Sequence, residues 1–256
     1  MIPKDNSKPV LQVEGLFASY GEVPVLHDVS FTVRQGEILV ILGESGCGKS
    51  TLLRNITGLY KPVSGSVKYW DLDATNMDEE QLSQLLRRVG ISFQEGALFN
   101  SMTVFDNVAL PLREHTDYSE EIIRALVMIK LSLVGLSHAA FLMPSEISGG
   151  MKKRAGVARA MALDPELLFF DEPSAGLDPV TAAGLDHLIL NLRSLLGITM
   201  VVITHELASI KTIADRVLML HQGRGIFQGS LSDAKACSLP VVRRFFNRER
   251  KSYLKT

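Results

Sequence analysis

The segment GESGCGKST, residues 43–51, holds the residue types that bind a chain of phosphates. Glycines at this spacing let backbone N–H groups curve around phosphate oxygens, and the lysine supplies a positive charge to the terminal phosphates. The serine hydroxyl that follows the lysine is a suitable ligand for Mg²⁺. The spacing predicts a phosphate-binding loop, and the residues expected to contact the ligand are Gly43, Ser45, Gly46, Cys47, Gly48, Lys49, Ser50 and Thr51.

Such a loop works together with acidic residues, and the segment LLFFDEP supplies two of them. Asp171 follows four apolar residues, at the expected end of a buried strand, where a carboxylate can hold Mg²⁺. Glu172 comes next and can orient or deprotonate an attacking water. Adjacent acids after a strand also occur in ordinary solvated loops, but the phosphate loop in the same chain favours the catalytic interpretation.

Two further polar side chains close short apolar strands. Gln94, in ISFQEG, is a candidate ligand for the metal ion or for the attacking water, and His205, in VVITHE, is a candidate contact to the terminal phosphate. A histidine at a strand end is more often a structural group than a catalytic one. However, the strand before His205 follows the Asp171 strand by one crossover, and parallel strands open on the same crevice at their carboxyl ends.

A second candidate anion site begins a helical pattern at SGGMKKRAGVARA, residues 148–160. The free N–H groups and the dipole of a helix start both favour negative charge, and Gly149 and Gly150 leave them uncovered. Ser148 is also a suitable N-cap for the same helix. The two interpretations are compatible.

The elements that must position these residues alternate between strand and helix patterns. Residues 10–35 alternate like antiparallel strands, whereas EILVIL is a continuous apolar run typical of a strand buried on both faces. Residues 97–147 are helical in pattern, with interruptions expected at Pro111 and Pro144. We predict an α/β fold in which helices flank a mostly parallel sheet, with an antiparallel β part and an inserted helical subdomain.

We expect one domain over residues 1–256. The core is predicted to take residues 10–95 and 160–235, the helical subdomain residues 96–159, and a basic tail residues 239–256. No internal repeat or low-complexity segment divides the chain.

Composition limits the classes of protein that fit. The formal net charge is −1, so the chain lacks the basic field of a nucleic-acid-binding protein. No apolar run approaches the roughly 18 residues that cross a bilayer, and the N-terminus lacks the apolar core of a signal peptide. The 2 cysteines have no metal-like spacing. We therefore expect a reduced, cytoplasmic chain.

Taken in order, the motifs resemble the nucleotide-binding subunit of ATP-binding-cassette (ABC) transporters. The phosphate loop, the glutamine of ISFQEG, SGGM, FFDEP, SAGLD and ITHE carry this resemblance, which covers about residues 10–230. It implies an ATPase that uses ATP and Mg²⁺. It also implies that Lys49, Gln94, Glu172 and His205 serve catalysis, and that the metal ligands are Ser50, Gln94 and Asp171.

The resemblance further implies that two copies pair head to tail around two ATP molecules. Ser148, Gly149 and Gly150 of each copy then face the ATP that the other copy binds, and Asp178 in SAGLD lies at the same interface. Tyr20 stands where the family stacks an aromatic ring on adenine. The alternative for this tyrosine is an ordinary strand aromatic.

The start of the helical insertion resembles one particular type of ABC ATPase. Residues 95–116 and Met151 are similar to the Mla and Mce type of ABC ATPase, which serves bacterial transporters of phospholipids and other lipids. Most ABC ATPases have Gln at the position of Met151, although a methionine can also be explained by packing. Within the insertion, some apolar side chains fit either the core of the chain or a groove that binds a partner's helix. They are Leu98, Phe99, Met102, Val104 and Phe105.

The resemblance implies partners: a second copy of the chain, an integral membrane permease (MlaE-like) and an MCE-domain lipid-binding protein. A small regulatory subunit also occurs in part of the family, and no nucleic acid is involved. The complex would place this chain peripherally on the cytoplasmic face of the bacterial inner membrane.

Two alternatives to a lipid transporter are the ATPase of a small-solute importer, for example for amino acids, and an ABC ATPase acting on DNA or ribosomes. The second usually carries a coiled-coil insertion or tandem cassettes, which this chain lacks.

The C-terminal segment 241–256 carries a net charge of +5. It pairs apolar positions with a basic face, which fits a solvated end helix, a contact with the opposite ATPase subunit, or a contact with anionic lipid headgroups.

Cys47 lies beside a lysine and a helix N-terminus, features that can lower a thiol pKa. We therefore expect alkylation of Cys47 to block ATP binding and ATP to protect against it.

Overall fold

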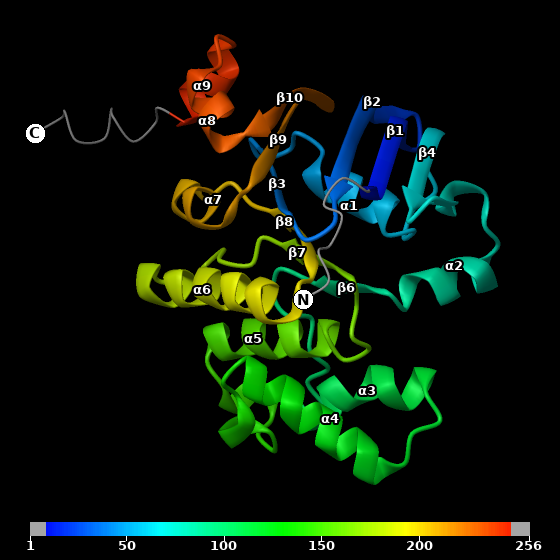
Figure 1. Ribbon diagram of the computed structural model, residues 1–256, viewed down its shortest axis with the longest axis vertical. Helices are drawn as coiled ribbons and strands as arrows, with labels where there is room; N and C mark the ends of the chain where they lie inside the picture. Colours follow the sequence, from blue (N-terminus) through cyan, green and yellow to red (C-terminus); the bar gives the residue numbers. More distant parts are fainter. Residues whose placement is uncertain (1–8, 247–256) are drawn as a thin grey trace, which may run out of the picture. The chain divides into compact units, whose positions relative to one another are not determined.

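The structure is a computed structural model that describes residues 9–246, and Figure 1 labels its helices and strands. The described residues form two compact units, residues 9–77 with 204–246 and residues 78–203.

In the first unit, the alternating segments form an antiparallel sheet in the order β2-β1-β4-β5. The inward positions of the long pair β1 and β2 are apolar and buried, for example Leu16 opposite Val29. The strands are β1 (Pro9–Tyr20), β2 (Val23–Arg34), β4 (Ser64–Tyr69) and β5 (Leu72–Asp73), followed by the short 3₁₀ helix η1 (Ala74–Asn76).

The apolar run before the phosphate loop is β3 (Ile38–Gly43), and all of its residues are buried. It pairs in parallel with β9, which continues into antiparallel β10. Three strands in the order β10-β9-β3 thus carry the phosphate loop and the helix after it. The other elements here are α1 (Lys49–Ile56), α7 (Leu207–Ile213), β9 (Arg216–His221), β10 (Arg224–Ser230) and α8 (Leu231–Ala236).

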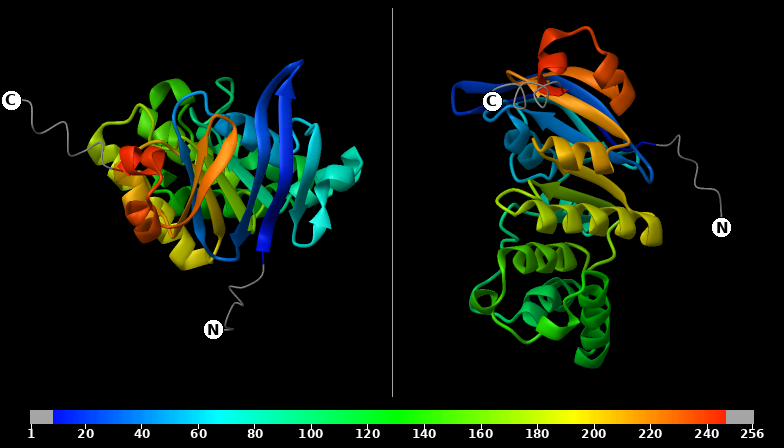
Figure 2. Two further views of the ribbon diagram at one scale, coloured as in Figure 1. Left: turned by 90° about the horizontal axis from the view of Figure 1, so that it is seen from above. Right: turned by 90° about the vertical axis from the view of Figure 1, so that its left-hand side faces the viewer.

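The predicted end helix exists as α9 (Pro240–Phe246), drawn in red beside α8 in Figures 1 and 2. Val242, Phe245 and Phe246 are buried, and α9 packs against α8. The apolar face of this helix is therefore covered by its own chain and is not solvated. The rest of the basic tail, residues 247–256, lies outside the described residues.

In the second unit, three parallel strands lie in the order β8-β7-β6. Figures 1 and 2 show α3, α4 and α5 packed side by side, as expected for the helical insertion. The elements are α2 (Glu79–Leu86), β6 (Val89–Ser92), α3 (Val104–His115), α4 (Glu120–Leu133), η2 (Ser137–Ala139), η3 (Pro144–Glu146), α5 (Gly149–Ala160), β7 (Leu167–Asp171), α6 (Pro179–Leu196) and β8 (Thr199–Ile203).

The expected interruption at Pro111 is wrong, because this proline lies inside α3. A proline costs a helix one N–H donor. Here Val108 and Leu112, on either side of it, are buried in the core of the unit, and this tertiary packing outweighs the local penalty. Pro144 does mark a break, since it begins the 3₁₀ helix η3, where its missing N–H costs nothing.

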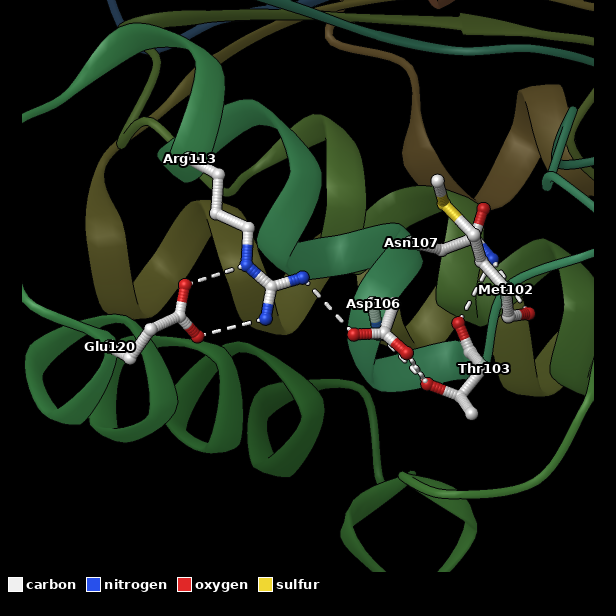
Figure 3. Close-up of polar contacts among 6 residues, drawn as sticks. All are labelled: Met102, Thr103, Asp106, Asn107, Arg113 and Glu120. Atoms are coloured by element: carbon white, nitrogen blue, oxygen red, sulfur yellow. Dashed lines mark hydrogen bonds and ion pairs between the residues drawn. The ribbon is translucent and has the colours of Figure 1, made fainter.

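The start of the insertion is fixed by one buried amide, Asn107, which is 0% exposed. Its Oδ1 accepts the backbone N–H of Phe99 at 2.7 Å, and its Nδ2 donates to the carbonyl oxygens of Phe99, Met102 and Thr103 at 2.9–3.2 Å. Figure 3 shows this amide facing the turn that precedes α3. Asn107 therefore joins both ends of the turn at residues 99–103 to α3.

An ion-pair bridge lies on the exposed side of the same helix (Figure 3). Arg113 donates to both carboxylate oxygens of Glu120 at 2.8 Å and to Asp106 at 3.1 Å. The Thr103 hydroxyl and Arg113 hold the pKa of the Asp106 carboxyl below its usual range. The bridge ties the end of α3 to the start of α4, with the modest stabilisation of partly exposed ion pairs.

The apolar residues at 98–105 divide into three groups by burial. Val104 and Phe105 are buried and belong to the core of the unit. Phe99 is 51% exposed, and its ring lies under the guanidinium of Arg159. Leu98 and Met102 are half-buried.

Candidate functional site

The phosphate loop leads from β3 into α1. Gly48 is the N-cap of α1 at φ 106°, and no side chain caps the first turn. Glycine is required there, because a methyl group would lie 2.6 Å from Cδ2 of Leu26 and the backbone is left-handed. Lys49 donates to the carbonyl oxygens of Gly43 and Glu44 at 2.9 and 3.1 Å, so its ammonium lies inside the loop. Uncapped N–H groups and a buried lysine together form an anion-binding loop.

The hairpin between β9 and β10 supports this loop. The Gly223 N–H donates to the Cys47 carbonyl at 3.1 Å, and the His27 N–H donates to the Gly223 carbonyl at 2.8 Å. A methyl group on Gly223 would lie 2.1 Å from the Val25 oxygen, so the close approach requires glycine. This support cannot be expected from the sequence, where the turn-forming Gln-Gly pair between two apolar runs indicates a hairpin but not what the hairpin contacts.

Tyr20 is 44% exposed. Its hydroxyl accepts from Arg54 at 2.9 Å, and its ring meets the Tyr60 ring edge-on, with 5.9 Å between the ring centroids. The bonds from Thr51 and Arg54 lower the pKa of the Tyr20 hydroxyl. Arg54 and Tyr60 orient this tyrosine, and neither was singled out from sequence.

His205 also lies in the first unit and is exposed. Its neighbour Thr204 is fully buried and donates its backbone N–H to the Ile41 carbonyl in β3 at 3.2 Å. This bond places His205 directly after a residue bonded to β3, the strand that leads into the phosphate loop, and its contact with the γ-phosphate stays a prediction.

The expected lowering of the Cys47 pKa is wrong. The side chain is 6% exposed, and burial raises the pKa of the Cys47 thiol even though Lys49 acts in the opposite direction. Burial disfavours the thiolate, and it dominates here because the lysine ammonium is already bonded to two carbonyl oxygens.

Alkylation of the folded protein at neutral pH is accordingly expected to be slow at Cys47, because the thiolate is the reactive form. Iodoacetamide should modify the partly exposed Cys237 first, and Cys47 only at higher pH or after unfolding. Peptide mass spectrometry of a labelling time course measures both rates. Labelling of Cys47 at the rate of Cys237 at neutral pH would contradict this account.

In the second unit, Asp171 ends β7 and Glu172 follows at φ 46°, in the left-handed region. This conformation is uncommon and strained for a residue other than glycine. The Glu172 N–H donates to the Ile203 carbonyl at 2.8 Å, which turns the chain sharply away from the strand. Both carboxylates are half-buried, and Gln94 is exposed two residues after β6 ends.

Ser148 is the N-cap of α5, and its hydroxyl accepts the Met151 N–H at 3.3 Å. A methyl group on Gly149 would meet no atom within 4 Å, whereas one on Gly150 would lie 2.6 Å from Cγ2 of Thr181. A cavity of about 420 Å³ lies beside Gly149 and residues 175–177. The helix start is therefore both capped, as expected, and open to a ligand at Gly149.

Asp178 is the N-cap of α6. Its carboxylate accepts the N–H groups of Val180 and Thr181 at 3.0 Å, and the Thr181 hydroxyl bond lowers its pKa. The aspartate thus stabilises the start of α6 within its own chain, in addition to the interface position that the family resemblance implies.

Comparison with known proteins agrees with this geometry. A sequence model of the family described as "ABC transporter" matches residues 26–175. The "Intermembrane phospholipid transport system ATP-binding protein MlaF" of Escherichia coli K12 is 44% identical over 223 residues, which cover 87% of this chain and 83% of that protein. The "Probable ribonucleotide transport ATP-binding protein mkl" of Mycobacterium tuberculosis H37Rv is 41% identical over 240 residues, covering 94% and 67% respectively.

Solved structures of ABC transporter ATP-binding proteins are also similar to this chain. The cbiO1 protein of Clostridium perfringens, part of the ABC transporter complex cbiONQ, matches with a TM-score of 0.83 and 29% identity over 97% of this chain and 96% of its own. The dimeric ATP-binding cassette MJ0796, bound to ADP and Pi, matches with a TM-score of 0.80 and 30% identity over 86% and 98%. By sequence and by fold, this chain belongs to the ABC transporter family, as an ATP-binding subunit that hydrolyses ATP to power transport.

Proposed function

We propose that the chain drives a transporter that moves phospholipid or a related lipid between membranes of the cell envelope. The observation that carries this proposal is the 44% identity to the phospholipid transport protein of Escherichia coli, which extends over 83% of that protein. The similarity therefore reaches beyond the ATP-binding motifs that all members share.

In the proposed reaction, the uncapped N–H groups of α1 and the Lys49 ammonium bind the β- and γ-phosphates, and Tyr20 stacks on adenine. Ser50 and Asp171, with Gln94, would hold Mg²⁺, which offsets the charge that develops on the phosphates. These are hard oxygen ligands, which fit this ion. Between residues 9 and 246, no group of three or more His, Cys, Asp or Glu side chains could hold a metal ion. Mg²⁺ bound together with phosphates does not need such a group, because the phosphate oxygens are also ligands.

Glu172 orients the attacking water and accepts its proton, and His205 stabilises the γ-phosphate. The half-buried carboxylate of Glu172 and the exposed imidazole of His205 suit these roles. Phosphoryl transfer depends mostly on positioning and on charge stabilisation, so the strained turn at Glu172 is a natural place for the water-activating group.

We further propose that two copies pair head to tail around two ATP molecules. The support is that the chain has two separate anion-binding helix starts, at α1 and α5, and that α5 is open at Gly149. A similar solved cassette is dimeric. Loss of a γ-phosphate then weakens the interface and makes hydrolysis a switch for the dimer.

Gly149→Ala tests this pairing directly. The fold has room for the methyl group, so the melting temperature should stay unchanged or rise slightly, as for Gly to Ala in a helix. ATP turnover should nevertheless fall roughly tenfold or more, because the methyl group obstructs the nucleotide bound by the partner copy. Gly150→Ala is the matched control for a fold defect, since it meets Thr181 and should lower the melting temperature. Wild-type turnover in Gly149→Ala would refute the assignment of this surface.

The membrane partners of the proposed complex are a permease and an MCE-domain lipid-binding protein, with a small regulatory subunit in some members. No helix in the described part of the chain is long and apolar enough to span a bilayer. A groove of about 610 Å³ on the second unit, lined by α2, β6 and the end of α3, has the size and mixed lining to take a short permease helix. The chain would then lie peripherally on the cytoplasmic face of the bacterial inner membrane.

A second candidate is the transport of a small solute, favoured by the description of the mycobacterial relative as a ribonucleotide transport protein. The two candidates differ in what the assembled complex carries. The tagged chain is purified from native membranes in mild detergent, its partners are identified, and bound lipid is extracted for mass spectrometry. Enriched phospholipid, and ATP turnover stimulated by phospholipid, support the lipid proposal. Stimulation by ribonucleosides or amino acids with no lipid enrichment overturns it.

A further inference from the structure

Helix α5 carries a buried lysine whose ammonium ends on the turn that holds Glu172. The Lys153 Nζ donates to the carbonyl oxygens of Pro173 at 2.8 Å and Ala175 at 2.6 Å, and weakly to that of Glu172 at 3.4 Å. The residue is 8% exposed. A buried ammonium needs such partners, and charge-assisted bonds are about twice as strong as neutral ones. Lys153 is therefore joined to residues 172–175 as one structural group.

The turn that Lys153 binds is the strained one. Glu172 lies at φ 46°, and its carbonyl also accepts the Ala175 N–H at 3.2 Å. A strained conformation persists only where its surroundings hold it in place. The lysine bonds converge on carbonyl oxygens of this turn, so their loss would let the turn relax and would move the Glu172 carboxylate.

The same helix also packs directly on the loop after Gln94. Gly156 approaches so closely that a methyl group there would lie 2.7 Å from Cα of Gly96. Arg159 donates to the carbonyl oxygens of Ala97 at 2.7 Å and Gly96 at 3.0 Å. One rigid helix thus contacts both loops that carry the residues assigned above to metal and water.

We propose that Lys153 is a positioning residue that couples the two ATP sites of the dimer. The start of α5, at Ser148 and Gly149, meets the ATP bound by the partner copy, while Lys153, one turn further along, holds the Glu172 turn of its own copy. Contact of α5 with the partner's nucleotide thereby affects the position of the water-activating Glu172 carboxylate. The proposal rests on the proposed function, specifically on the dimer and on the role of Glu172.

Lys153→Met removes the charge and keeps the length of the side chain. In the assembled transporter, kcat should fall roughly 10- to 100-fold, the cost of small misplacements in active sites, while KM for ATP changes little. The Hill coefficient for ATP should fall to one. Lys153→Arg keeps donors at this position and should restore kcat to within about tenfold of the wild type. Lys235→Gln, which removes the charge of an exposed lysine on α8, should leave kcat, KM and the Hill coefficient unchanged.

A merely structural lysine would produce a different result: the melting temperature and ATP affinity would fall together with kcat, and Lys153→Arg would not rescue turnover selectively. If Lys153→Met does not fold, Lys153→Gln, whose amide can donate to one of the carbonyls, takes its place in the same comparison. A wild-type Hill coefficient of one, or a Lys153 variant with wild-type kcat, overturns the proposal.

A double variant separates this inference from the function on which it rests. If Lys153 acts through Glu172, then adding Lys153→Met to Glu172→Gln should not lower the residual turnover further. A further loss by the same factor as in the single variant means that Lys153 acts elsewhere, and overturns the inference alone. Wild-type turnover in Glu172→Gln by itself means instead that the assignment of Glu172 is wrong.

Discussion

Glu172→Gln is expected to bind ATP as the wild type does and to hydrolyse it about 10²- to 10⁴-fold more slowly, the usual contribution of a positioned general base. The amide is nearly isosteric with the carboxylate, and the backbone bond from the Glu172 N–H to the Ile203 carbonyl remains. ATP is then trapped in both sites, so the variant should accumulate as an ATP-bound dimer. Steady-state phosphate release and light scattering after size-exclusion chromatography measure the two effects.

The matched control is Glu166→Gln. Glu166 pairs with Arg88 at 2.8 Å, and both side chains are substantially exposed, so the pair contributes little. Turnover and oligomeric state should remain those of the wild type. Loss of ATP binding in Glu172→Gln, without loss of the fold, would show that the carboxylate serves nucleotide binding and not the chemical step.

Asn107→Ala is expected to lower the free energy of unfolding by about 2–4 kcal/mol, a large value for one polar residue. The substitution leaves the partly buried Phe99 N–H without its acceptor and removes the donor to three carbonyl oxygens. The higher helix propensity of alanine offsets only about 0.5 kcal/mol of this loss. Urea unfolding followed by circular dichroism measures the difference.

Asn76→Ala is the control, because Asn76 is exposed and donates only locally to Asp73 at 2.9 Å. It should change stability by less than about 0.5 kcal/mol. Asn107→Asp sharpens the test: it keeps the acceptor for Phe99 but places a carboxylate against three carbonyl oxygens, so it should be at least as destabilising as alanine. Equal stability of Asn107→Ala and the wild type would mean that residues 99–103 are held by other contacts.

The sequence predicts best those parts of the site whose chemistry is local. The glycine and lysine spacing of the phosphate loop follows from the needs of a phosphate chain, and the buried strand before it is a continuous apolar run. Asp171 at the end of β7 could be expected in the same way. The start of α5 could be expected because its cap and its glycines are neighbours in the chain.

The remaining features depend on tertiary contacts that no local pattern reports. The contact of Gly223 with the phosphate loop joins residues about 175 positions apart in the chain. Lys153 looks in sequence like any solvated lysine of a helix, and only the fold shows it buried on a turn. The Cys47 pKa was predicted in the wrong direction because a neighbouring charge is visible in sequence and the extent of burial is not.

The left-handed backbone at Glu172 has a consequence for the evolution and engineering of this chain. Glycine adopts φ 46° without the strain that glutamate bears, which costs on the order of 1–3 kcal/mol. Selection for thermal stability alone would therefore reward loss of the very side chain that hydrolysis needs. Libraries of this protein that are selected for thermal stability should therefore be screened for ATP turnover at every round. At position 172, a substitution that raises stability is expected to abolish turnover.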